Sequence, residues 1–450
     1  MTAQLTRSLT RLAVTSALAL SLAACAGGLF GGGGGKKSTP TVGERTPILS
    51  RIESGAKADP ELAAVAVTLP AAQANAEWGQ PGGSASKAAG HFALGAAPQS
   101  VWTAQVAGAT NRMRIAAAPV IGDGRVYAVG SDGAISAFDA ITGARVWLQS
   151  AEVARELQSA VFGGGVSYAD GKVYATNGAG DVMALDAATG ASLWKVKPAG
   201  PLRGSPTVDF GSIYVMTQDN QIVALDAATG KLKWQESAST ASSGVFGVAA
   251  PAAGQGTVIA GFSSGELIAY RYENGRTLWA DALARTNIST AVGALTDIDA
   301  DPIIDSGRVY ALGQGGRMAA YELVTGQRIW ELNLAGISTP ALAGDWLFTL
   351  TDDARLLAIA RASGKVRWIS QLARYRDEED KKGPIFWQGP VLAGDTLWTV
   401  NSDGQLWRVS PGDGTASLFA ELKQPISLPP VVANATLYIL DDSGRITAFR

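Results

Sequence analysis

The chain carries few residues of the types that bind metals or attack substrates. Cys25 is the one cysteine and His91 is the one histidine among 450 residues. These counts exclude a disulfide framework, a thiolate metal cluster and any site that needs two imidazoles. The remaining candidates for chemistry are carboxylates, and three aspartates lie close together at residues 297–301.

Single carboxylates also recur at Asp139, Asp186 and Asp226, each followed by a Thr-Gly turn. A carboxylate at a turn accepts hydrogen bonds from neighbouring backbone amides. We therefore interpret these three residues as structural and not as catalytic.

Cys25 lies at the end of a secretory signal. Arg7 and Arg11 precede an apolar run over residues 12–22, which is too short to span a membrane as a stable helix. The following Leu22-Ala23-Ala24-Cys25 resembles the lipobox of bacterial lipoproteins. The resemblance implies that residues 1–24 are a removed signal peptide and that Cys25 carries acyl chains. The alternative is an ordinary signal peptide with an incidental cysteine.

The residues after Cys25 favour a tether to a membrane. A glycine run over 31–35 is followed by two lysines and by a Pro/Ala-rich stretch. We expect residues 25–75 to form a flexible linker of about 50 residues that reaches roughly 40 Å. Ala26 stands where inner-membrane lipoproteins have Asp, so the resemblance implies the periplasmic face of the outer membrane.

The composition indicates many short strands joined by tight turns. Hydrophobic residues make up 47% and charged residues 17%, with 54 Gly and 12 Trp. A net charge of -2 gives no basic field for phosphates, so nucleic acid is excluded as a partner.

One motif recurs along the chain. Residues 124–147 are GRVYAVGSDGAISAFDAITGARVW, and close copies begin at Gly171 and Gly211. Spacings between copies run from 38 residues to 51 residues, which is typical of propeller blades, because one four-stranded sheet must stack on neighbours to cover its apolar faces. Each copy begins with a predicted strand that can be identified by one apolar residue. This strand occurs eight times, at Val126, Val173, Ile213, Val258, Val309, Leu347, Leu397 and Leu437.

A tryptophan follows the turn glycine of most copies by four residues and is expected to pack the outer strand against the next blade. The seventh copy has Leu418 instead, and the eighth ends at Arg450 without its own Trp-bearing strand. An orphan strand around Trp102 precedes the first copy, so we expect it to complete the last blade and close the ring. The expected docking residues are Trp102, Trp147, Trp194, Trp234, Trp279, Trp330 and Trp368.

The predicted fold is therefore all-β, an eight-bladed β-propeller over residues 76–450 whose N-terminal strand closes the last blade. Trp78 and His91 lie in a Gly/Ala-rich region before that strand, and we expect this region to pack under the ring as a plug. A charged insert at 374–382 is interpreted as a solvated loop, with an extra docking element as the alternative.

The blade pattern Ala-x-Asp-x-x-Thr-Gly-x-x-x-Trp, intact at 137–147, 184–194 and 224–234, resembles the tryptophan-docking motif of quinoprotein dehydrogenases. Those enzymes bind a quinone beside adjacent cysteines, and no cysteine follows Cys25 here. Over about residues 98–450 the chain also resembles the BamB family of outer-membrane assembly lipoproteins. That resemblance implies a scaffold without cofactor or catalytic residues. Its implied partner is the barrel protein BamA, whose periplasmic domains it binds.

Contact residues follow from the same resemblance. The stretch 294–302 is similar to the acidic loop that contacts BamA in this family, with Asp297 and Asp299 on the motif. Blade order places Val245 and Phe246 at the second contact loop, where Phe246 replaces an Arg. Arg203, in Leu202-Arg203-Gly204 one loop earlier, is the alternative. The acidic loop has a second interpretation, a solvated turn whose carboxylates cap local amides.

Exposed strand edges would also accept an unfolded outer-membrane client by strand addition, although no residue identifies the edge. Two rival functions stay open on the sequence: a periplasmic quinoprotein dehydrogenase and a binder of cell-wall polysaccharide. The first predicts a quinone absorbance band. The second predicts a row of exposed aromatic residues, whereas most Trp here occupy docking positions.

Overall fold

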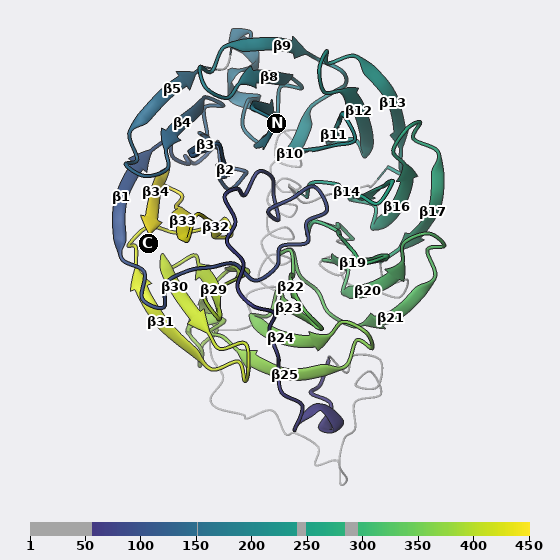
Figure 1. Ribbon diagram of the computed structural model, residues 1–450, viewed down its shortest axis with the longest axis vertical. Coiled ribbons are helices and arrows are strands. Elements are labelled where there is room, and N and C mark those ends of the chain that lie inside the picture. Colours follow the sequence, from purple (N-terminus) through teal and green to yellow (C-terminus); the bar gives the residue numbers. More distant parts are fainter. Residues whose placement is uncertain (1–55, 151, 241–248, 284–295) are drawn as a thin grey trace, which may run out of the picture. The chain divides into compact units, whose positions relative to one another are not determined.

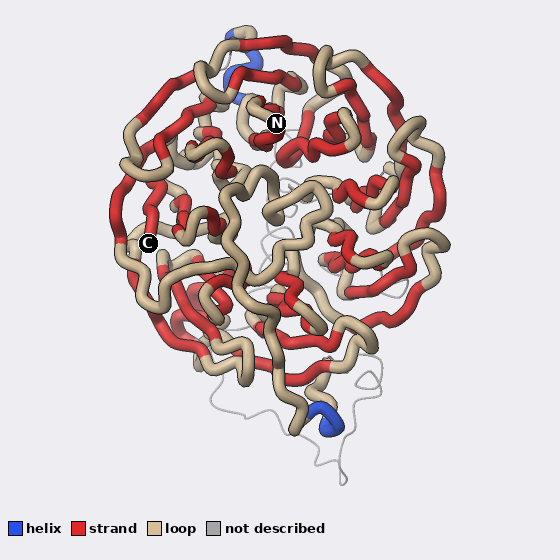
Figure 2. The backbone as a smooth tube through the Cα atoms, in the orientation of Figure 1, coloured by secondary structure: helices blue, strands red, loops and turns tan. Residues whose placement is uncertain are grey.

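The computed structural model describes residues 56–150, 152–240, 249–283 and 296–450. Within these residues the chain forms eight four-stranded antiparallel sheets arranged around an axis, which confirms the predicted propeller (Figure 1). Figure 2 shows that strands make up the blades and that loops and turns connect them. None of the short helical turns among the described residues has the length and apolar character that a membrane span requires.

Each blade runs from an inner strand near the axis to an outer strand at the rim. Blade 1 is β2 (Val120–Gly122), β3 (Arg125–Val129), β4 (Ile135–Asp139) and β5 (Arg145–Gln149); blade 2 is β6 (Val166–Ala169), β7 (Lys172–Thr176), β8 (Val182–Asp186) and β9 (Ser192–Val196). Blade 3 is β10 (Leu202–Asp209), β11 (Ser212–Thr217), β12 (Gln221–Asp226) and β13 (Leu232–Ser237); blade 4 is β14 (Ala252–Gly254), β15 (Thr257–Gly261), β16 (Glu266–Arg271) and β17 (Thr277–Ala282).

The second half of the ring repeats this order. Blade 5 is β18 (Ile303–Asp305), β19 (Arg308–Gly313), β20 (Arg317–Glu322) and β21 (Arg328–Leu332); blade 6 is β22 (Ala341–Ala343), β23 (Trp346–Leu350), β24 (Arg355–Ala360) and β25 (Val366–Gln371). Blade 7 is β28 (Trp387–Ala393), β29 (Thr396–Asn401), β30 (Gln405–Val409) and β31 (Ala416–Glu421); blade 8 is β32 (Val431–Ala433), β33 (Thr436–Leu440), β34 (Arg445–Phe449) and β1 (Ser100–Gln105). Two 3-10 turns, at Pro60–Leu62 and Arg155–Ala160, lie outside the blades.

The two ends of the propeller domain meet in blade 8. Strand β1 pairs antiparallel with β34, and Trp102 lies opposite Ala448. Gln99 and Arg450 exchange a further pair of backbone hydrogen bonds of 2.7 and 2.9 Å. The ring is therefore closed by the N-terminal strand, as the orphan strand of the sequence predicts.

Seven tryptophans of the outer strands each pack on the turn glycine of the next blade. A Cβ atom on any of these glycines would lie 2.4–2.8 Å from the indole, and all seven have φ between +70° and +77°, so no other residue type fits. Each indole N–H also donates to a backbone oxygen of that blade over 2.8–3.3 Å. The pairs are Trp102–Gly143, Trp147–Gly190, Trp194–Gly230, Trp234–Gly275, Trp279–Gly326, Trp330–Gly364 and Trp368–Gly414.

The contact between blades 7 and 8 lacks this arrangement for a reason of topology. In the other blades the turn glycine lies between the third and fourth strands. In blade 8 these strands are β34 and β1, which come from opposite ends of the domain, so no turn connects them. Leu418 accordingly stays partly exposed. Phe419 packs at this seam instead, with ring centroids 5.0 Å from Trp398 and 6.3 Å from Phe449.

Residues 56–94, which we call the strap, cross one mouth of the ring (Figure 1, dark purple). Residues 58–75 were expected to belong to the flexible linker, but they contact the propeller. The Asp59 amide donates to Val366 O over 2.7 Å, and Arg367 Nε donates to Val65 O over 2.7 Å. Main-chain pairing with β25 holds this part in place, so the docked region begins no later than Ala58.

The charged insert between blades 6 and 7 is a hairpin of two short strands, β26 (Tyr375–Asp377) and β27 (Lys382–Pro384). It is solvated, as expected, since residues 374–382 are exposed apart from the half-buried Tyr375, but it is a paired hairpin and not an irregular loop. Arg376 forms an ion pair with Asp403 of blade 7. The side chain of Phe386, which follows the hairpin, is 65% exposed.

Candidate functional site

The two mouths of the ring are built from different parts of each blade. The strap lies at the mouth where inner strands end and turn back into the second strand, and we call this the strap mouth. The opposite mouth, the loop mouth, carries the segments that lead into the inner strands. The sequence predicts several residues that contact a partner. Those that lie within the described ranges all belong to the loop mouth: Arg203, Asp297 and Asp299.

Arg203 lies near the start of β10 and is buried, with 4% of its surface exposed. Its Nη1 donates to Ser263 Oγ over 2.8 Å, and its Nη2 donates to Gly261 O over 3.4 Å. Burial lowers the pKa of the guanidinium, while the negative charges of Asp299 and Asp297 oppose that shift. The structure therefore brings the alternative contact residue Arg203 into the electrostatic range of the acidic loop.

The acidic loop is fastened to two blades. Thr296 Oγ1 donates to Ser263 O over 2.8 Å, and the Ile298 amide donates to Phe262 O over 3.2 Å. The Asp297 carbonyl accepts from the Gln314 amide over 2.9 Å, and Asp297 is fully buried. Ser263 thus joins Arg203 of blade 3 to the loop that leads into blade 5, a role that no sequence signal distinguishes from an ordinary turn serine.

Asp299 differs from a solvated turn carboxylate. Its Oδ1 is buried and has no hydrogen-bond partner among the described residues. Burial and the neighbouring charge of Asp297 raise its pKa to about 7, with Asp352 adding to the rise and Arg203 opposing it. The interpretation of this loop as a turn that caps its own amides does not account for such a carboxylate.

The turn carboxylates Asp139, Asp186 and Asp226 behave differently. Asp139 Oδ1 accepts from Thr142 Oγ1 and Thr142 N over 2.8 Å each, and from Ile141 N over 3.0 Å. These hydrogen bonds, first the hydroxyl and then the amides, lower the pKa of Asp139. The same pattern holds at Asp186 and Asp226, which supports their structural interpretation.

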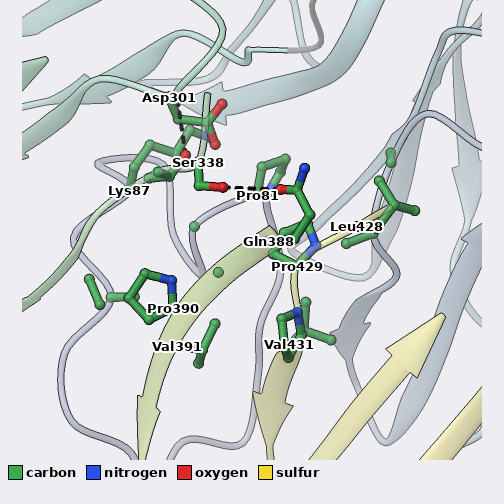
Figure 3. A pocket seen from close by; sticks show the side chains of 18 of the residues that line it. Pro81, Lys87, Asp301, Ser338, Gln388, Pro390, Val391, Leu428, Pro429 and Val431 are labelled. Carbon is green, nitrogen blue, oxygen red and sulfur yellow. Dashed lines mark hydrogen bonds between the residues drawn. The ribbon is translucent and has the colours of Figure 1, made fainter. Parts of the chain in front are cut away.

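A cavity of about 230 Å³ lies on the axis between the two mouths. Trp78, Pro81 and Lys87 of the strap form part of its lining, and Pro390 and Val391 are among the residues on the blade side (Figure 3). Ser338 Oγ and Gln388 Oε1 are 3.1 Å apart in a hydrogen bond on its wall. The cavity is mainly apolar, with prolines and aliphatic residues from several blades.

Lys87 is fully buried beside this cavity, a position that the sequence did not reveal. Its Nζ donates to Thr207 Oγ1 over 3.0 Å. Burial lowers the pKa of Lys87 to about 8, although the charge of Asp301 opposes the shift. Asp301 in turn accepts the Ala250 amide over 2.7 Å and contributes its own amide to Thr339 Oγ1 over 3.0 Å.

Three of the expected site residues are not described. Val245 and Phe246 lie within 241–248, and Cys25 lies within 1–55, all outside the described residues. In the described ranges, no group of three or more His, Cys, Asp or Glu side chains is placed to hold a metal ion.

Sequence and structure comparisons place the chain among known proteins. A family model described as "Outer membrane protein assembly factor BamB" matches residues 93–154 and 131–370. A relative with that name from Salmonella typhimurium is 31% identical over 282 residues, which cover 62% of this chain and 72% of the relative. The strap up to residue 92 precedes the range that the family model matches.

Two solved structures share the fold. BamB from Moraxella catarrhalis has a TM-score of 0.65 at 22% identity, with 78% of this chain and 99% of that chain covered. A quinohemoprotein alcohol dehydrogenase from Comamonas testosteroni has a TM-score of 0.66 at 15% identity, with 83% and 80% covered. At these identities the likeness supports the propeller fold and carries no argument about activity.

Proposed function

The chain belongs to the BamB family of outer-membrane protein assembly factors, and on that premise we propose that it is a non-enzymatic scaffold subunit of the outer-membrane β-barrel assembly complex. In this role it binds the periplasmic domains of a BamA-like barrel protein and supports the insertion of barrel proteins. Lipidation at Cys25 holds it on the periplasmic face of the outer membrane.

The observation that carries the proposal is the convergence of Arg203 and the acidic loop at the loop mouth. Buried charges without full compensation are expensive in an isolated protein. A partner that supplies hydrogen-bond donors and excludes water relieves that cost, and such charges give an interface its specificity and register. Asp299, with a buried oxygen that lacks a donor, is the clearest example.

The test is co-purification of the lipidated protein from solubilised outer membranes. We expect a large β-barrel protein to be retained by the wild type and lost on Asp297→Asn/Asp299→Asn. A matched control removes two exposed carboxylates at the opposite mouth, Asp123→Asn/Asp170→Asn, and should retain the partner. Equal retention by both double variants would remove the acidic loop from the interface.

The same preparation tests the rival enzymatic function. Addition of a quinone cofactor and calcium should give no quinone absorbance band and no alcohol oxidation. Cofactor-dependent oxidation of an alcohol would overturn the scaffold proposal.

A further inference from the structure

The strap contacts the blades one after another in chain order. Seven blades are reached through hydrogen bonds from strap residues to inner strands or to the turns that follow them. In order these contacts are Asn75 with Val432, Trp78 with Ile121, Gly79 with Tyr168, Gln80 with Val208, Ala85 with Ala253, Ser86 with Ile304 and Phe92 with Leu392. The inner strand of blade 6 is reached by packing, since Ala88 lies against the apolar cluster that contains Leu342, while Asp59 and Val65 hydrogen-bond to the outer strand of that blade.

Most of these hydrogen bonds use the main chain of the strap. Trp78 and Ile121 exchange two, of 2.9 and 2.8 Å, and the Tyr168 amide donates to Gly79 O over 2.6 Å. The Ala253 and Ile304 amides donate to Ala85 O and Ser86 O over 2.9 Å each. An inner strand leaves one edge unpaired toward the axis, and the strap satisfies that edge in the way that an added peptide strand does.

Four side chains fix the position of the strap along this path. Trp78, Gln80, Lys87 and His91 are all at least nine-tenths buried. Gln80 makes two hydrogen bonds to the Val208 main chain, of 2.9 and 3.0 Å. His91 bonds to Pro70 O over 2.8 Å and to the Asp395 amide over 3.0 Å, so it joins two passes of the strap to blade 7.

Small residues are required where the strap passes close to the blades. A Cβ atom on Gly79 would lie 2.7 Å from Tyr168 O. Gly82 has φ +66°, and its Cβ would lie 3.0 Å from Lys87 Cβ. The site therefore selects a Gly/Ala/Ser-rich peptide that turns at residues 80–87 and carries one indole at a fixed place.

We propose that the strap mouth is a peptide-binding site formed jointly by the eight inner strands, and that residues 70–94 are its ligand in cis. When residues 70–94 are bound, they cover the strap mouth. They also connect blade 7 to blade 8 across the seam that lacks a tryptophan–glycine contact. The strap joins the propeller through Gly95–Ala97, which are exposed, so ligand and receptor are connected by a short accessible segment. This inference does not depend on the proposed scaffold function.

The experiment cuts that connection after folding. A protease recognition sequence replaces residues 95–97 in the unlipidated mature protein, and the folded protein is cleaved. We expect the released segment to co-elute with the ring in size-exclusion chromatography and to exchange with a labelled synthetic peptide of residues 70–94. Immediate loss of the segment with no change in the melting temperature of the ring would overturn the proposal.

Specificity is measured with the same cut protein. A peptide with Gly79→Val should bind more weakly by about tenfold or more, because its side chain meets the Tyr168 carbonyl. A peptide of scrambled order should not compete, and the uncut protein should not bind labelled peptide, since its site is filled. Equal binding of the scrambled peptide, or binding to the uncut protein, would show attachment elsewhere and contradict the proposal.

Discussion

The strap mouth and the loop mouth of this propeller use buried polar groups in opposite ways. At the strap mouth, the side-chain amide of Gln80 uses both its nitrogen and its oxygen in hydrogen bonds, and both ring nitrogens of His91 are hydrogen-bonded. At the loop mouth, Arg203 Nε and Asp299 Oδ1 are buried without a hydrogen-bond partner in the described residues. The strap mouth also has one buried polar atom without a partner, Asn75 Oδ1, but the unsatisfied atoms of Arg203 and Asp299 at the loop mouth belong to ionisable groups.

This difference separates stability from recognition. Satisfied polar groups and a buried tryptophan contribute to the free energy of folding. Unsatisfied groups lower that free energy, and they persist in sites that complete their hydrogen bonding with a partner. Substitutions at the strap mouth should therefore change stability first, and substitutions at the loop mouth should change partner binding and its dependence on pH.

The largest expected effect is at the strap mouth. Trp78→Ala removes a buried indole that packs on Phe92 with ring centroids 5.5 Å apart. Loss of this ring should lower the free energy of unfolding by about 3–5 kcal/mol in chemical denaturation. Trp78→Phe, which keeps an aromatic ring, should cost clearly less. A loss below about 1 kcal/mol for Trp78→Ala would mean that the strap adds little to the ring.

The next effect concerns Asp299 at the loop mouth. Its pKa in the folded protein is raised from 3.8 to about 7. At pH values between these two, the folded state therefore binds more protons than the unfolded state. The free energy of unfolding should fall as pH rises from about 4 to about 7, by an amount on the order of a few kcal/mol at most. Asp297, Asp352 and Arg203 are the charged groups that act on it.

Asp299→Asn should flatten that decrease, as measured by denaturation at several pH values. Asp139→Asn serves as the control, because the pKa of Asp139 is lowered and not raised. An unchanged slope in Asp299→Asn would place the titrating group elsewhere.

A smaller effect of opposite sign is expected from Lys87 of the strap. Its pKa is lowered from 10.5 to about 8, so between these values the unfolded state binds the extra proton. The free energy of unfolding should rise with pH over this window, by roughly 1–3 kcal/mol. Lys87→Met should remove the rise, and Asp301→Asn should lower the pKa of Lys87 further because the attraction of Asp301 is lost.

The smallest effect on stability is expected at the exposed hairpin edge. Phe386→Ala should change the free energy of unfolding by no more than about 0.5 kcal/mol, because the side chain is 65% exposed. A reduced recovery of the proposed barrel partner by this variant would extend the proposed loop-mouth interface to the hairpin. Unchanged recovery would leave the proposed interface at Arg203 and the acidic loop.

The blades could be predicted from the sequence because their contacts are local and repeated. The turn glycine and the tryptophan four residues later recur, and each of the seven pairs of Trp and next-blade Gly meets in the structure. Closure by Trp102 followed from the same period. The sequence placed Trp78 and His91 in a plug under the ring, and the structure confirms that both are buried at one mouth.

The site could be predicted only in part. Asp297 and Asp299 belong to a recognisable acidic stretch, but Arg203 lies 94 residues away from Asp297 along the chain and was only an alternative. Ser263, which joins them, lies in a turn that resembles every other turn. The early start of the strap was also missed, since a Pro/Ala-rich composition is the same for a free linker and for a chain paired to a strand edge.

The sequence by itself determined the repeated unit, the number of blades and the residues that join one blade to the next, because spacing of turn and docking residues encodes short-range geometry. Only the tertiary structure decided which inter-blade loops meet at one mouth and how the strap follows the other. Those contacts arise from ring closure, which brings residues of distant blades together around the axis, and no local pattern records them.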